Sequence, residues 1–130
     1  RMIPKFRGRC PDGGWVHGSC LKFDENTCFI MPEFGGASTL SYAQIFNHTA
    51  QYVDIETIGQ STGLKDKNGT EIYVGDIITI IDDEEKDTGF GWNEEVILHN
   101  GAFMAGDDNL LVNVNFRSVV VNNVFEIKFR

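Results

Sequence analysis

The stretch TGLKDKNGTEIYVGDIITI, residues 62–80, decides the fold. Asn68-Gly69 is the dipeptide that best accepts the positive φ angles of a tight hairpin turn, and apolar residues lie on both sides of it, at Leu64 and at Ile72-Tyr73. Gly75-Asp76 marks a second reversal, and the β-branched run 77–81 that follows is typical of a buried strand. The stretch therefore predicts a hairpin and a strand, and it assigns these residues to turns and packing, not to chemistry.

Strand signals continue over most of the chain. Short apolar or alternating runs are separated by turn residues at near-regular spacing, which is typical of a small barrel or sandwich. The last run shows a half-buried pattern most clearly, because Phe125, Ile127 and Phe129 alternate with charged residues. We expect an all-β protein with strands at 5–10, 15–23, 28–31, 52–58, 77–81, 95–98, 102–104, 110–116, 119–121 and 124–129.

The stretch 35–51, GGASTLSYAQIFNHTAQ, is the least regular part of the chain. Ser41 is a candidate N-cap for a short helix that would hold Ile45 and Phe46. However, isolated helices shorter than about 12 residues are marginal without packing. We favour a loop followed by a strand.

The charge is unevenly distributed. The chain carries 19 acidic and 11 basic residues, a formal net charge of −8. This disfavours a general affinity for nucleic acid, because neutralisation of phosphates by Lys and Arg supplies most of that binding energy. The basic first ten residues either lie on the outer face of a strand, facing water or the chain's own acids, or contact nucleic acid or an acidic partner. The candidate binding residues are Lys5, Phe6, Arg7, Arg9 and Trp15.

The residues that carry chemistry form no recognised catalytic or metal-binding pattern. The cysteines have none of the short zinc spacings and are odd in number, so we interpret them as small buried apolar side chains. The histidines are scattered, and the sequence contains neither a phosphate-binding loop nor a complete calcium loop. These residues are Cys10, Cys20, Cys28, His17, His48 and His99.

An acidic run, 82–87, follows the β-branched strand. Carboxylates at Asp82, Asp83 and Glu85 are weak candidates for a divalent cation, since hard cations take several oxygen ligands. Such runs are more often solvated loops, which is the interpretation we favour. We expect no metal, no cofactor and no enzymatic activity.

No apolar run approaches the roughly 18 residues of a membrane span, and no export signal follows the first residues, so we expect no membrane association.

The residues 62–77, TGLKDKNGTEIYVGDI, resemble the central motif of the YopX family. Further segments similar to the family lie at 5–8, 13–18, 55–60, 100–103 and 121–126, so the resemblance runs nearly end to end. The stretch 35–51 matches poorly and is interpreted as a variable insertion, and Val74 stands where the family usually has an acid. The signature residues are Thr62, Gly63, Leu64, Asp66, Asn68, Gly69, Ile72, Tyr73, Gly75 and Asp76.

The resemblance implies a largely β protein that is encoded by a bacteriophage or prophage. We expect it in the cytoplasm of the bacterial host, because no export signal marks the first residues. The resemblance implies an N-terminal β-hairpin region, 1–61, and a small SH3-like or barrel-like C-terminal region, 62–130, as two domains or as one continuous domain. It also implies self-association, and it carries over no catalytic residue.

Three hypotheses for the function follow. The first, which we favour, is a phage or prophage accessory protein of unknown biochemical activity that binds without catalysis, as an oligomer or as an adaptor for a phage or host protein. The second is a nucleic-acid-associated accessory factor that uses the basic N-terminal strand. The third is an enzyme or small-molecule binder that uses the acidic middle of the chain.

Overall fold

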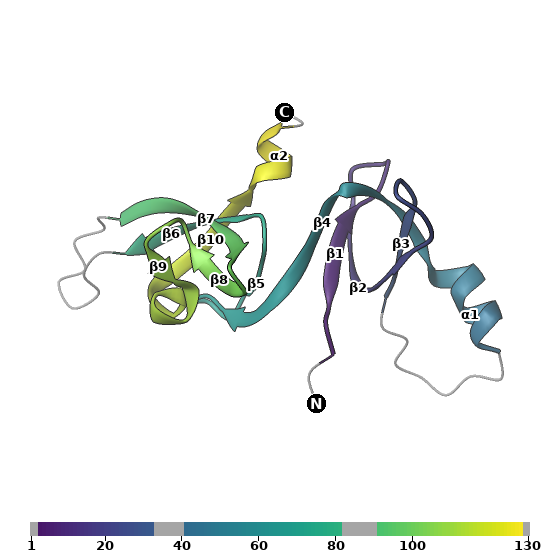
Figure 1. Cartoon of the computed structure of the whole chain (residues 1–130), viewed down its shortest axis with the longest axis horizontal. Helices are drawn as coiled ribbons and strands as arrows, with labels where there is room; N and C mark the ends of the chain where they lie inside the picture. The colour runs from purple at the N-terminus through teal and green to yellow at the C-terminus, as the bar shows by residue number, and fades with distance from the viewer. Residues whose placement is uncertain (1–2, 33–40, 82–90, 129–130) are drawn as a thin grey trace. The chain divides into compact units, whose positions relative to one another are not determined.

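The computed structural model describes residues 3–32, 41–81 and 91–128, which belong to two compact units. Unit 1 is Arg1–Gln60 and unit 2 is Ser61–Arg130, so the division falls within the long strand β4, Gln51–Lys65. Most described residues lie in strands (Figure 1), which confirms the all-β class. Within the described ranges, neither helix has the length and apolar character needed to cross a bilayer.

The strands of unit 1 close into a ring. The strands β1 and β2, β2 and β3, β3 and β4, and finally β4 and β1 pair antiparallel, so each strand has a neighbour on both sides. The ring encloses a core in which Cys28, Ile30 and Val53 are fully buried. A Cβ on Gly8 would lie 2.8 Å from the Cβ of Val53, so glycine is what lets β1 pass this close to the core. The strands are β1 (Phe6–Arg9), β2 (Trp15–Lys22), β3 (Cys28–Met31) and the first part of β4.

A helix, α1 (Tyr42–Thr49), precedes β4, so the expectation of a loop and strand over this segment was wrong. Two interactions explain the helix. Ser41 Oγ accepts a hydrogen bond from the backbone N–H of Gln44, and Gln44 Oε1 accepts one from the N–H of Ser41, which is a complete capping box. Tertiary packing adds to the cap, because Ile45 is buried and the ring of Phe46 lies 6.0 Å from that of Phe29. The first residues of the irregular stretch, up to residue 40, lie outside the described residues.

Unit 2 is a curled sheet around a second core. Its strand order is β10-β6-β7-β8-β9, and the end of β4 pairs with β5. The fully buried side chains come from the strands and from the first 3₁₀ helix, and Leu64 and Val120 pack against them. The elements are β5 (Glu71–Tyr73), β6 (Asp76–Ile81), β7 (Gly91–His99), β8 (Ala102–Ala105), β9 (Asn109–Leu110), η1 (Leu111–Asn113), η2 (Asn115–Arg117), β10 (Ser118–Asn123) and α2 (Val124–Lys128).

Two expected strands in unit 2 have a different structure. The segment 110–116 is largely two 3₁₀ turns, in which Leu111 and Val114, three residues apart, both point into the core. The segment 124–128 is the short helix α2, not a strand. Asn123 Oδ1 accepts hydrogen bonds from the backbone N–H groups of Phe125 and Glu126, and this side chain starts the helix where the apolar alternation predicted a strand.

Candidate functional site

The first signature turn is organised by Asp66, which is 6% exposed. Its Oδ1 accepts hydrogen bonds from the backbone N–H groups of Asn68 (2.9 Å) and Thr70 (2.8 Å). Its Oδ2 accepts one from the N–H of Val120 in β10, at 2.9 Å. Gly69 completes the turn with a φ of +86°, but Asn68 does not have a positive φ, so the glycine alone adopts the conformation predicted for the Asn-Gly dipeptide. The carboxylate thus serves three backbone donors, which is a structural role.

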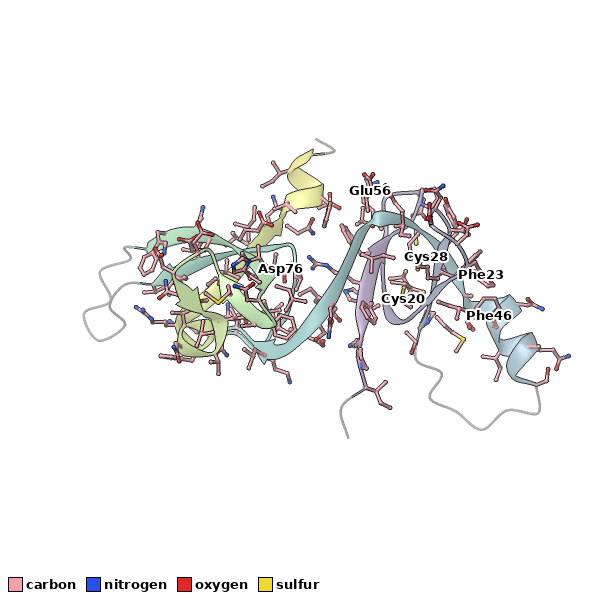
Figure 2. All side chains as sticks on the ribbon, in the orientation of Figure 1. Cys20, Phe23, Cys28, Phe46, Glu56 and Asp76 are labelled. Atoms are coloured by element: carbon pink, nitrogen blue, oxygen red, sulfur yellow. The ribbon has the colours of Figure 1, made fainter. Side chains whose placement is uncertain are left out.

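The second signature turn depends on Gly75 and Asp76. Gly75 has a φ of +98°, and its N–H donates to the carbonyl of Val96. Asp76, which Figure 2 labels in unit 2, is 1% exposed, and its Oδ2 accepts a hydrogen bond of 2.8 Å from the N–H of Tyr73. Asp66 and Asp76 therefore each stabilise a turn of their own.

The other signature residues belong to the core and its hydrogen bonds. The buried Thr62 donates from Oγ1 to the carbonyl of Ile72, which joins β4 to β5. Ile72 and Tyr73 are buried, and Leu64 packs against the core of unit 2. No chemical site is needed to account for the motif.

The basic N-terminal strand, β1, is one of the strands that form the ring of unit 1, and it pairs with β2 on one side and with β4 on the other. The guanidinium carbon of Arg7 lies 5.1 Å from the ring centroid of Trp15, a cation–π contact, and only 7% of Arg7 is exposed. Arg9 is opposite Trp15 in β2, Phe6 packs against the core, and Lys5 is half-buried. The structure thus brings Arg7, Arg9 and Trp15 together. Arg7 and Phe6, however, mainly contact other residues of unit 1, Arg7 the ring of Trp15 and Phe6 the core.

A layer of large apolar side chains covers the outer face of unit 1, and sequence reasoning missed it. Leu21, Phe29 and Tyr52 are aligned across three strands by the pairings Leu21–Phe29 and Phe29–Tyr52. Phe23 and Phe46 complete the layer, with ring centroids 5.3 Å and 6.0 Å from that of Phe29. We call these five residues the aromatic surface. Figure 2 labels Phe23 and Phe46 where the β2–β3 hairpin meets α1.

The aromatic surface is open to water over much of its area. Leu21 is 46% exposed, Phe23 58% and Tyr52 47%. Isolated exposed apolar residues are normal, whereas contiguous patches mark interaction sites. The aromatic residues were visible in the sequence, but the register that aligns them across three strands was not.

Two cysteines in unit 1 are in direct contact. The Sγ atoms of Cys20 and Cys28 are 2.7 Å apart (Figure 2 labels both). Cys28 is fully buried, as expected of a small apolar side chain, whereas Cys20 and Cys10 are partly exposed and do not meet that expectation. Burial, followed by the hydrogen bond with Cys28 and the charge of Cys28, raises the pKa of Cys20 to about 12. Burial, and to a smaller extent the charge of Asp12, also raises the pKa of Cys10.

The remaining chemical candidates that the structure describes do not form a site. The acidic run with Asp82, Asp83 and Glu85 lies outside the described residues. Among the residues that are described, no three His, Cys, Asp or Glu side chains are grouped so that they could hold a metal ion. His17 and His99 are exposed on different units.

Comparisons with known proteins agree with this fold. A family model described as YopX protein matches residues 5–126. The crystal structure of protein EF1440 from Enterococcus faecalis is similar to this chain, with a TM-score of 0.59 and 24% sequence identity over 98% of this chain and 97% of that chain. At this level of identity the likeness shows a shared fold. No curated protein matches the sequence.

Proposed function

The chain belongs to the YopX family, and we propose that it acts by binding, as a non-catalytic adaptor that associates with a second copy of itself through the aromatic surface of unit 1. The observation that carries this proposal is the exposure of Leu21, Phe23 and Tyr52, each close to half or more, in one contiguous layer. Burial of apolar area contributes about 25 cal/mol per Å², and aromatic side chains are enriched in interfaces, so such a layer favours association.

Side chains, not strand edges, are the means of association that unit 1 offers. Each strand of its ring already has a partner on both sides over part of its length, which leaves little free edge for a further strand. In unit 2, the N–H of Val120 and the carbonyl of Ser118 in β10 are bonded to the turn at Asp66 and Lys67. The exposed aromatic surface is therefore the better candidate.

A second copy fits this surface because an apolar layer is complementary to itself across a two-fold axis. The net charge of −8 opposes the approach of two copies, but the five side chains of the aromatic surface are uncharged. Salt screens this repulsion, so we expect association to strengthen as salt is raised. Binding to nucleic acid has the opposite dependence, because counterion release weakens it at high salt.

The biological role we propose is that of a phage or prophage accessory protein in the bacterial cytoplasm, whose self-associated form presents a platform to a phage or host protein. The alternative, a nucleic-acid-associated factor, would need the cations of the first strand. The burial of Arg7 against Trp15 counts against it.

Sedimentation velocity over a wide concentration range tests the proposal. We expect the wild type to form a dimer or larger species, and the double variant Leu21→Thr/Phe23→Ser to be a monomer with an unchanged far-ultraviolet circular dichroism spectrum. The matched control is Leu98→Thr/Val121→Thr in unit 2, which removes two side chains of similar exposure, 51% and 54%. A wild type that stays monomeric at every concentration, or a control that dissociates instead, would refute the proposal. Retention of DNA or RNA in low-salt filter binding would favour the alternative.

A further inference from the structure

The β2–β3 hairpin places two thiols on the same face of the sheet. Cys20 is opposite Ile30, and Cys28 is opposite Lys22, so the two cysteines are diagonal neighbours across the hairpin. Both contribute to the core of unit 1, on the side opposite to Phe29. Their sulfur atoms are 2.7 Å apart, a separation only slightly longer than the covalent S–S bond of about 2.0 Å.

We propose that Cys20 and Cys28 are a redox modification site, at which the two thiols form a reversible disulfide inside the ring of unit 1. The backbone already holds the hairpin closed through four residue pairings between β2 and β3, and the two sulfur atoms are in contact before the bond forms. The inference does not depend on self-association, because it concerns the inner face of the hairpin and not the aromatic surface.

The oxidant we propose is a low-molecular-weight disulfide, RSSR, acting by thiol–disulfide exchange. The thiolate of Cys20 attacks one sulfur of RSSR, and RS⁻ leaves, so that Cys20 carries a mixed disulfide. The sulfur of Cys28 then attacks Cys20 Sγ and displaces the second RS⁻. In total, two protein thiols are oxidised to one disulfide, and RSSR is reduced to two RSH molecules, which take up the two protons.

The exposure of the two residues determines the order of these steps. Cys20 is partly exposed and can meet a dissolved oxidant, whereas Cys28 is fully buried and can reach only its neighbour. Cys20 is therefore the attacking residue and Cys28 the resolving residue. Cys10 packs against the same core, but Cys28 is the thiol in contact with Cys20.

The test uses the full reduced chain, incubated with oxidised glutathione in buffers of increasing oxidised-to-reduced ratio. Remaining thiols are then alkylated and the protein is mapped by mass spectrometry. We expect the loss of two thiols per chain, an intact mass before alkylation that is lower by two hydrogen atoms, a single crosslink between Cys20 and Cys28, and a higher melting temperature for unit 1. Reduced glutathione should reverse all of these changes.

Single variants separate the roles. Cys10→Ser should behave as the wild type, Cys28→Ser should stop at a glutathione adduct on Cys20, and Cys20→Ser should leave Cys28 unmodified. The proposal is overturned if the wild type accumulates a stable adduct without closing the bond, if Cys10 supplies the crosslink, or if thiols are lost only after denaturation. These outcomes are read from the wild type, so they do not depend on the variants folding.

Discussion

The Asp66 carboxylate accepts a hydrogen bond of 2.9 Å from the backbone N–H of Val120, across 54 residues of sequence. The same side chain holds its own turn through Asn68 and Thr70, and the next residue, Lys67, donates from its N–H to the carbonyl of Ser118. The turn is thereby fastened to β10, the last strand of the sheet. This double role explains how a motif made of turn residues specifies a whole unit.

Replacing Asp66 should destabilise unit 2. Asp66→Ala leaves three backbone N–H groups without their acceptor. Asn68 and Thr70 are exposed, so water can replace the acceptor there, whereas Val120 is half-buried, and we expect a loss of about 1–3 kcal/mol. Asp66→Asn keeps one acceptor oxygen, so its free energy of unfolding should lie between those of the wild type and Asp66→Ala. Urea unfolding in a Trp15→Phe background leaves Trp92 of unit 2 as the reporter. The exposed Asp108→Ala controls for the loss of charge. Equal midpoints for Asp66→Ala and Asp108→Ala would contradict this role.

The parts of the fold that were predicted from the sequence are those determined by adjacent residues. Asn68-Gly69 fixes a turn by its own backbone preference, and the run 77–81 is β-branched whatever surrounds it. The end of the chain was mispredicted because two local signals compete there. The alternation of Phe125 and Ile127 favours a strand, but the capping bonds of Asn123 favour a helix, and the helix forms.

The candidate sites were harder to predict because they depend on register. The loop after β2 closes with a hydrogen bond from the N–H of Phe23 to the carbonyl of Thr27. This closure sets Leu21 opposite Phe29 and brings Cys20 to Cys28. A hairpin shifted by one residue would turn every one of these side chains to the other face. The sequence contains these residues, but it does not show which residue of β2 pairs with which residue of β3.

Gly18→Ala should destabilise unit 1. A Cβ at Gly18 would overlap the carbonyl oxygen of Met31 in the paired strand, and because both groups are backbone, β2 and β3 would have to move apart. We expect a cost of about 2–3 kcal/mol, typical of overpacking. The measurement is urea unfolding followed by Trp15 fluorescence in a Trp92→Phe background. Gly14→Ala, which meets only the Asp12 side chain at 3.2 Å, should stay within about 0.5 kcal/mol of the wild type. The idea fails if the two variants unfold together.

Ser41→Ala should loosen α1 without unfolding unit 1. The change removes the Oγ that accepts from the Gln44 N–H, and loss of such a cap costs about 1 kcal/mol. Amide hydrogen exchange should become several-fold faster in α1 and stay unchanged in β3. Asn47→Ala, an exposed change to a better helix former, should not accelerate exchange. Unaltered protection in Ser41→Ala would show that packing of Ile45 and Phe46 alone holds the helix.

The rate of oxidation at Cys20 should keep rising with pH well beyond the range of an ordinary thiol. Only the thiolate attacks a disulfide, and burial, followed by the interaction with Cys28, raises the pKa of Cys20 from 9.0 to about 12. Below that pKa the thiolate fraction grows about tenfold per pH unit, so the initial rate of thiol loss with oxidised glutathione should do the same from pH 7.5 to 10. The measurement uses Cys10→Ser, which leaves the pair intact. The same variant unfolded in urea is the control, and its rate should level off near pH 9, where an exposed thiol is mostly ionised. A folded protein whose rate also levels off there would show that Cys20 is an ordinary exposed thiol.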